Sequence, residues 1–169
     1  MTTTQNDRVD RYKARCLTQE RNLFGRLQAA ALASRTQAKR LLKSKGDLSI
    51  TEWRVLWDLA EAGPLTVTEM ASIQRTDHAL ISRTIPAMIE KGYVATKTGT
   101  TDRRTSLVAL TAAGRSVFEG TSVIMSQRRA ALSTAFSEAD LDVFLGLIDR
   151  FEQFVEDPKS LSPATEGTA

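Results

Sequence analysis

Two adjacent arginines, Arg103 and Arg104, follow Asp102 in the stretch KTGTTDRRTSLVAL, where small polar residues give way to an alternating apolar pattern. Another arginine, Arg83, follows Ser82 within a helical pattern earlier in the chain. A guanidinium group presents several N–H donors in a planar fork, which suits phosphate oxygens and the edge of a guanine base. The chemistry that these residues predict is therefore recognition of anions or bases, without a covalent step.

The inventory of reactive side chains argues against an enzyme. The chain has one histidine, His78, and one cysteine, Cys16, and it shows neither a nucleophile–base pair nor a glycine-rich phosphate loop. A metal site of the Cys/His kind is not expected, and neither is a cofactor. Cys16 follows two basic residues, Lys13 and Arg15, a setting in which some thiols are reactive. An ordinary thiol is the simpler interpretation, and a cysteine-based redox-sensing regulator is the alternative.

Composition indicates a soluble chain of moderate size. Of its 169 residues 41% are hydrophobic and 25% are charged, which is enough for a core beneath a polar surface. No apolar run approaches the roughly 20 residues that a membrane span needs, and the N-terminus lacks the apolar segment of a secretory signal. We therefore expect a cytoplasmic protein with no membrane partner.

Charge is distributed unevenly along the chain. Residues 1–46 carry eleven Lys or Arg and three Asp or Glu, a net charge of +8. Residues 112–169 carry five positive and nine negative side chains, a net charge of −4. Such asymmetry indicates either a nucleic-acid partner or pairing between the two ends of the chain. A solvated basic helix face is the alternative for many of the individual cations.

Helical periodicity dominates the first half of the chain. Apolar or small residues recur at three- and four-residue spacing over residues 23–41, which predicts a long helix over residues 18–45 that ends at Gly46. Ser49 and Glu52 then form a capping box ahead of the run WRVLWDLAEAG, so another helix begins there.

Two short helices follow in close succession. A capping box from Thr66 to Glu69 opens a helix that reaches about Ile73. After a tight connection, Asp77 is the predicted N-cap of a second helix that Gly92 closes. Two short helices joined by such a turn form a helix-turn-helix pattern.

After Gly92 the periodicity changes from helical to alternating. The segments YVATKT and TSLVAL are rich in β-branched residues and flank a turn, so they predict a hairpin. Thr111 is expected to cap a long helix to about Ala135, and Ser137 to cap a last helix with heptad spacing. Residues 158–169 form a polar tail that is expected to be disordered. The predicted fold class is mainly α with a small β-hairpin wing.

The segments LSITEWRVLWDLAEAGPLTVTEMA and LISRTIPAMIEKGYVATKTGTTDRRTSLVALTAAGR resemble the MarR (multiple antibiotic resistance regulator) family of bacterial transcription factors. The most specific parts of the resemblance are Ser82-Arg83, Gly92, Asp102-Arg103-Arg104 and LTAAGR. It implies a winged helix-turn-helix DNA-binding domain over residues 47–111, with dimerisation helices over residues 1–46 and 112–157. It also implies a homodimer that binds palindromic operator DNA.

The second helix of the pair is the expected recognition helix, whose N-terminal residues would meet base edges in the major groove. The predicted outward residues are His78, Ala79, Ser82 and Arg83, and the predicted core residues are Ile81, Ile85 and Met88. Arg83 would bind either guanine or a phosphate, and Ser82 likewise a base or a phosphate. His78 is a base contact or simply an exposed polar residue. Pro86 removes the N–H that would bond the Ser82 carbonyl, so a kink is expected there.

Further contacts to DNA are expected from the turn and the wing. Gln74, Arg75 and Thr76 are predicted phosphate contacts, with surface solvation as the alternative. A cationic wing tip suits the narrow minor groove. By resemblance to the family, Asp102 orients Arg104 into the groove, Arg103 touches phosphate and Lys97 assists. The alternative is an exposed Asp102–Arg104 ion pair, worth only about 0–1 kcal/mol.

Trp53 and Trp57 lie four residues apart and predict either a core pair or the wall of a pocket for a small aromatic effector. The predicted function is a homodimeric, sequence-specific DNA-binding transcriptional regulator, acting as a repressor that an effector releases. A winged helix used for protein–protein contacts is the alternative, which a neutral or acidic wing would have favoured.

Overall fold

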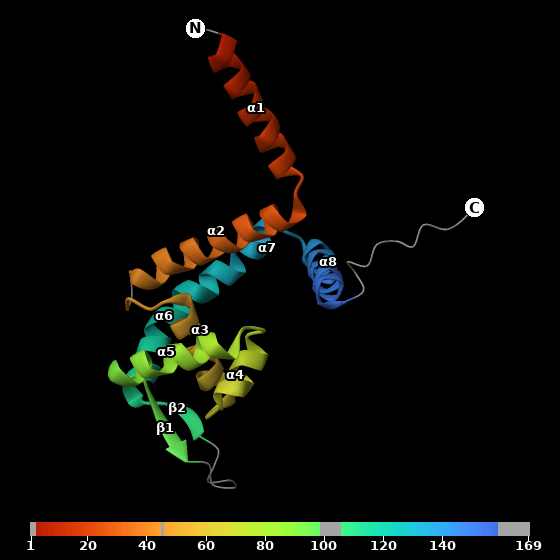
Figure 1. Ribbon diagram of the computed structural model, residues 1–169. Coiled ribbons are helices and arrows are strands. Elements are labelled where there is room, and N and C mark those ends of the chain that lie inside the picture. Colours follow the sequence, from red (N-terminus) through yellow and green to blue (C-terminus); the bar gives the residue numbers. More distant parts are fainter. Residues whose placement is uncertain (1–2, 45, 99–105, 159–169) are drawn as a thin grey trace, which may run out of the picture. The chain divides into compact units, whose positions relative to one another are not determined.

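The computed structural model describes residues 3–44, 46–98 and 106–158 (Figure 1), and the chain divides into two compact units, Met1–Met125 and Ser126–Ala169. The described residues form helices and one two-stranded antiparallel sheet, which confirms the expected fold class. In chain order the elements are α1 (Thr3–Glu20), α2 (Leu23–Lys43), α3 (Ile50–Ala62), α4 (Val67–Ile73), α5 (His78–Glu90), β1 (Val94–Thr98), β2 (Ser106–Leu110), α6 (Ala112–Ala130), α7 (Leu132–Ala135) and α8 (Glu138–Glu156).

The N-terminal region differs from the sequence prediction. The single helix expected over residues 18–45 is wrong, because α1 ends at Glu20 and α2 begins anew at Leu23. Asn22 between them is extended (φ −82°, ψ 107°), and its side chain accepts a hydrogen bond from the Gly25 N–H at 3.2 Å. Asparagine in this conformation is a strong N-cap, so the chain restarts the helix there. α2 also ends at Lys43, before Gly46, the residue at which the sequence predicted its end.

The core of the first unit is enclosed by α2–α6 and the hairpin. The capping boxes at Ser49–Glu52 and Thr66–Glu69 both form, and Asp77 accepts a hydrogen bond from the Ala79 N–H at 2.8 Å. The helices α3, α4 and α5 therefore begin where the sequence predicts. The largest fully buried side chains of the unit are Leu42, Leu56, Leu59, Met70, Ile81, Met88, Val55, Val94, Val108 and Thr121.

The hairpin is tied to the helix-turn-helix at its base. The strands pair in a register that runs from Val94 opposite Leu110 to Thr98 opposite Ser106. Leu65, in the connection between α3 and α4, adds a bridge to the far side of β2 through hydrogen bonds with Val108 of 3.0 and 2.7 Å. The wing strands are therefore fixed against the connection that precedes α4.

The start of α6 lies against the chain that enters β1. The Thr111 hydroxyl donates to the Gly92 and Tyr93 carbonyl oxygens at 2.6 and 3.1 Å and accepts from the Gly114 N–H at 3.0 Å. A Cβ atom at Gly114 would lie 1.9 Å from the Tyr93 carbonyl oxygen. Since real contacts of this kind are never so short, only glycine permits this close approach of α6 to the base of the wing.

The C-terminal helices also show one correction. The helix expected to reach about Ala135 ends at Ala130, and α7 follows as a separate turn after Ala131. Ala131 still donates its N–H to the Gln127 carbonyl, so the interruption is a single irregular residue. The Ser137 capping box forms as expected and opens α8.

The second unit exposes much of its apolar surface. None of the residues of α7 or α8 is buried. The large exposed hydrophobic residues of α8 are Val143, Phe144, Leu145, Leu147, Phe154 and Val155. Exposed hydrophobic residues that gather in one patch mark interaction sites in folded proteins. Among the described residues, no helix combines the length and the apolar character that crossing a membrane would require.

Candidate nucleic-acid interface and the adjoining cavity

α5 buries one face and exposes the other as the sequence predicts. Ile81, Ile85 and Met88 are buried, at 0%, 6% and 0% exposure. His78, Ser82 and Arg83 are exposed on the other side, and Ala79 is half-buried. Pro86 is exposed too, and α5 continues across it to Glu90. The N-terminal half of α5 therefore presents polar and cationic side chains to solvent, while the contacts that we expect them to make with DNA stay predictions.

The turn between α4 and α5 holds a residue in an uncommon conformation. Arg75 has φ 47°, a left-handed backbone that side chains other than glycine and asparagine adopt at a cost. The Thr76 N–H reaches back to the Ala71 carbonyl at 3.0 Å, which closes the end of α4. This geometry turns the chain sharply between the two helices and holds Arg75 exposed beside the start of α5.

Gln74 has a structural contact that the sequence did not indicate. Its Nε2 donates to Oδ2 of Asp58 on α3 at 2.7 Å. Burial raises the pKa of Asp58, although this hydrogen bond and the nearby Arg54 oppose the shift. The Gln74 side chain thus ties the turn to α3, and its predicted phosphate contact remains a prediction.

The wing strands β1 and β2 carry one of the predicted wing contacts, Lys97. Lys97 is exposed on β1, where it pairs with Leu107 of β2. The predicted tip residues Asp102, Arg103 and Arg104 lie outside the described residues, so their roles also stay predictions.

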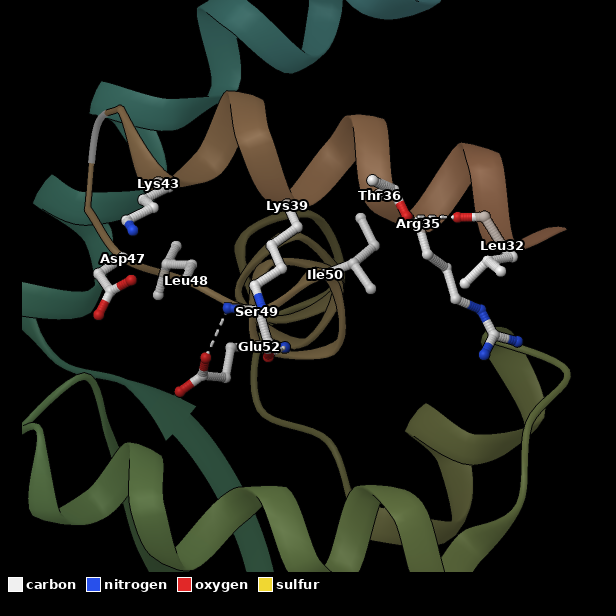
Figure 2. Close-up of a pocket in the computed structure, with 10 residues that line it drawn as sticks. All are labelled: Leu32, Arg35, Thr36, Lys39, Lys43, Asp47, Leu48, Ser49, Ile50 and Glu52. Carbon is white, nitrogen blue, oxygen red and sulfur yellow. Dashed lines mark hydrogen bonds between the residues drawn. The ribbon is translucent and has the colours of Figure 1, made fainter. Parts of the chain in front are cut away.

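A cavity of about 470 Å³ opens between α2 and the start of α3 (Figure 2). It is lined by Leu32, Arg35, Thr36, Lys39, Lys43, Asp47, Leu48, Ser49, Ile50 and Glu52. Three of these residues are cationic and all three come from α2, a helix with five Lys or Arg and no Asp or Glu. Figure 2 shows Lys39 extending from α2 toward Ser49 and Glu52 on the opposite wall. The cavity is therefore basic along one wall and mixed along the other.

The Glu52 carboxylate, on that second wall, bonds both to the start of α3 and to the end of α5. It is 7% exposed, and its Oε2 accepts from the Ser49 N–H at 2.7 Å. Its Oε1 accepts from Lys91 Nζ at 2.6 Å, at the C-cap of α5. Burial raises the pKa of Glu52, but the hydrogen bonds from Lys91 and Ser49 outweigh it and leave the pKa lowered. The same contact raises the pKa of Lys91, so both groups are held in their charged forms.

The two tryptophans form a packed pair. Trp53 is 3% exposed and Trp57 is half-buried, with ring centroids 5.1 Å apart and planes tilted by 43°. Neither lines the cavity described above, although Glu52 and Ile50 of the same helix do. Within the described part of the chain the buried Trp53 Nε1 has no hydrogen-bond acceptor. Their predicted role at an effector site is not tested by these contacts.

Comparison of the sequence with known proteins finds relatives among HTH-type transcriptional regulators. The family model described as MarR family matches residues 48–106. The uncharacterized HTH-type transcriptional regulator YwoH of Bacillus subtilis is 29% identical over 133 residues, covering 79% of this chain and 96% of YwoH. The HTH-type transcriptional repressor IacR of Pseudomonas putida is 36% identical over 76 residues, which is 45% of each chain.

Solved structures share the architecture. A MarR/EmrR family transcriptional regulator from Acinetobacter sp. ADP1 has a TM-score of 0.71 at 26% identity, covering 80% of this chain and 96% of its own. The MepR–DNA complex of S. aureus has a TM-score of 0.72 at 14% identity, covering 81% and 99%. The BpsR protein of Bordetella bronchiseptica has a TM-score of 0.64 at 18% identity, covering 78% and 94%. The last two show the fold alone.

A helix-turn-helix with an outward, cationic second helix and an adjoining hairpin defines a winged-helix DNA-binding transcriptional regulator. The matched family model and the relatives narrow this class of regulator to one family. Residues 48–106 match the MarR family, and over most of its length the chain is similar to YwoH and to a MarR/EmrR family regulator of known structure.

Proposed function

We propose that the protein is a homodimeric repressor that binds palindromic operator DNA in the cytoplasm and leaves it when a small molecule binds. The observation that carries the DNA-binding part is the division of α5 into a buried face and an exposed face bearing Ser82 and Arg83. A helix that packs by one face and presents Arg on the other can enter a major groove. Residues 47–111 would form the DNA-binding domain, with residues 1–46 and 112–157 serving dimerisation.

The surface of the helices outside this domain supports dimerisation. α8 exposes large hydrophobic residues and carries six acidic side chains against one arginine. α2 carries five basic side chains and no acidic one. We infer that an acidic, apolar α8 covers basic helices of a second copy, since burial of apolar area supplies affinity and opposite charges supply orientation.

The cavity between α2 and α3 supports the effector part. Its cations Arg35, Lys39 and Lys43 outnumber its acids Asp47 and Glu52, and Glu52 is already paired with Lys91. The site therefore favours a small anion, and its apolar residues Leu32, Leu48 and Ile50 suit an aromatic body. DNA binding by the structurally similar BpsR is regulated by 6-hydroxynicotinic acid, an aromatic carboxylic acid.

The test is selection of DNA from a random-sequence pool by the purified protein, followed by binding measurements at several salt concentrations. A repressor dimer should select two inverted half-sites roughly 10 base pairs apart. Arg83→Ala should cost about 1–3 kcal/mol of discrimination at one base pair of each half-site if the contact is to guanine. Arg103→Ala should lower the slope of log affinity against log salt by about one per half-site.

The matched control is Arg8→Ala, which removes the same charge from α1, far in sequence from every predicted DNA contact. It should leave both base discrimination and salt slope unchanged. Enrichment of no sequence would contradict the regulator proposal. Unchanged DNA binding in both Arg103→Ala and Arg104→Ala would favour a wing that contacts protein instead.

A further inference from the structure

The turn between α4 and α5 has the hydrogen bonds of a Schellman motif, with an arginine where glycine is usual. Gln74 is the C-cap of α4. The Arg75 N–H donates to the Ser72 carbonyl at 3.1 Å, and the Thr76 N–H donates to the Ala71 carbonyl at 3.0 Å. The residue after the C-cap takes a left-handed backbone in this motif, which favours glycine there. The turn therefore holds a cationic side chain, that of Arg75 at φ 47°, where the backbone conformation disfavours a side chain.

A strained conformation of this kind persists only when the surrounding structure holds it. One contact from another helix reaches the turn as a hydrogen bond of 2.7 Å from Gln74 Nε2 to Asp58 Oδ2, across sixteen residues of chain. Both side chains are half-buried, so water competes with this bond less than it would at an open surface. Asp58 lies on α3, which Leu56 and Leu59 anchor in the core. The turn is thus tied to a fixed part of the fold.

The same hydrogen bond limits what Gln74 can do at a DNA backbone. An ionised carboxylate only accepts hydrogen bonds, so the Gln74 amide must turn its nitrogen toward Asp58. One amide N–H is thereby used within the protein, and the amide oxygen, an acceptor like the oxygens of a phosphate, cannot bind one. Arg75 follows in the chain, is exposed, and has the N–H donors that a phosphate requires.

We propose that Asp58 is a positioning residue for DNA binding, which acts through Gln74 to hold Arg75 where its guanidinium group meets a phosphate. The inference rests on the proposed function, because it takes this turn to lie against DNA. It assigns the phosphate contact to Arg75 and gives Gln74 a role in geometry. When the bond to Asp58 is lost, the turn relaxes from its left-handed conformation and the Arg75 side chain loses its direction.

The test separates the hydrogen bond of Asp58 from its charge. Asp58→Ala removes both, whereas Asp58→Asn removes the charge and keeps an oxygen that accepts from Gln74. With DNA that the unmodified protein selects, Asp58→Ala should weaken binding about tenfold and Asp58→Asn by less than about twofold. Asp58→Ala should also lower the slope of log affinity against log salt by about one per half-site, as Arg75→Ala does. A loss of stability alone leaves that slope unchanged, and urea midpoints show that each variant is folded.

Further variants show whether the effect passes through Gln74 and Arg75. Gln74→Ala breaks the same bond from the side of the turn, so it should match Asp58→Ala, and it replaces that variant in every comparison if Asp58→Ala does not fold. In an Arg75→Ala background, Asp58→Ala should weaken binding by less than about a further twofold, because the contact that it positions is already gone. Glu61→Ala, which removes an exposed acid from the same helix, is the matched control and should leave the salt slope unchanged.

Each contrary result has a distinct meaning. Equal binding by Asp58→Ala and Asp58→Asn overturns the proposal. A full effect of Asp58→Ala in the Arg75→Ala background also overturns it, because Asp58 would then act on another contact. So does a loss in Gln74→Ala that adds to the loss in Asp58→Ala, because Gln74 would then contact phosphate itself. If the unmodified protein selects no DNA, the proposed function itself fails, and this is known before any variant is made.

Discussion

Gly114→Ala should destabilise the protein although alanine is the better helix former. The added Cβ would lie 1.9 Å from the Tyr93 carbonyl oxygen and 2.8 Å from its carbon, and both atoms belong to the backbone at the entry to β1. That oxygen also accepts hydrogen bonds from the N–H and the hydroxyl of Thr111, each at 3.1 Å. Relieving the clash requires α6 and the base of the wing to separate, which strains both hydrogen bonds.

The magnitude follows from three contributions. Overpacking costs about 1–3 kcal/mol, and two weakened hydrogen bonds cost about 0.5–1.5 kcal/mol each. The higher helix propensity of alanine offsets about 1 kcal/mol of this destabilisation. The expected loss in the free energy of unfolding is therefore about 3 kcal/mol, taking the middle of these ranges.

Gly120→Ala is the matched control on the same helix. A Cβ at Gly120 would meet nothing within 4 Å, and the residue is exposed, so alanine should stabilise α6 by up to about 1 kcal/mol. The assay is urea unfolding at one protein concentration, because association with a second copy would make stability depend on concentration. If Gly114→Ala proves as stable as Gly120→Ala, the close approach of α6 to Tyr93 does not exist in solution.

Three further predictions concern single side chains. Burial raises the pKa of Glu52, but the hydrogen bonds from Lys91 and Ser49 outweigh it and hold the pKa below its ordinary value of 4.5. Ionised Glu52 therefore stabilises the fold at pH values above 4.5, and this stability is lost as the pH falls through the folded-state pKa. In Glu52→Gln the urea midpoint should therefore change less with pH between about pH 3 and 7. Arg75→Gly should raise stability by about 1 kcal/mol by relieving the left-handed backbone, and should weaken DNA binding at the same time; a less stable variant would mean that the side chain matters more to the fold than its backbone costs. Ser137→Ala should cost about 1 kcal/mol by removing the cap of α8, detected by thermal unfolding, and Ser137→Asp should restore it.

The sequence by itself determined the elements of the DNA-binding domain, because their signals are local. A capping box needs only a hydroxyl and a carboxylate three residues apart, so Ser49 and Thr66 correctly predicted where α3 and α4 begin. The spacing of Ile81, Ile85 and Met88 likewise fixed which side of α5 is buried. The same reading missed Asn22, since an asparagine within an otherwise helical pattern is a weaker signal than a capping box.

Tertiary structure alone decided the contacts between residues that are distant along the chain. Nothing in the sequence pairs Glu52 with Lys91 or Asp58 with Gln74, because each contact joins two helices whose relative placement depends on the packing of the core. The cavity also depends on tertiary structure, because the sequence of α2 by itself predicts only a solvated face of cations. Gly114 was visible in LTAAGR as part of a resemblance, but its physical reason, a backbone carbonyl within 1.9 Å of any Cβ, exists only once α6 has packed against the entry to the wing.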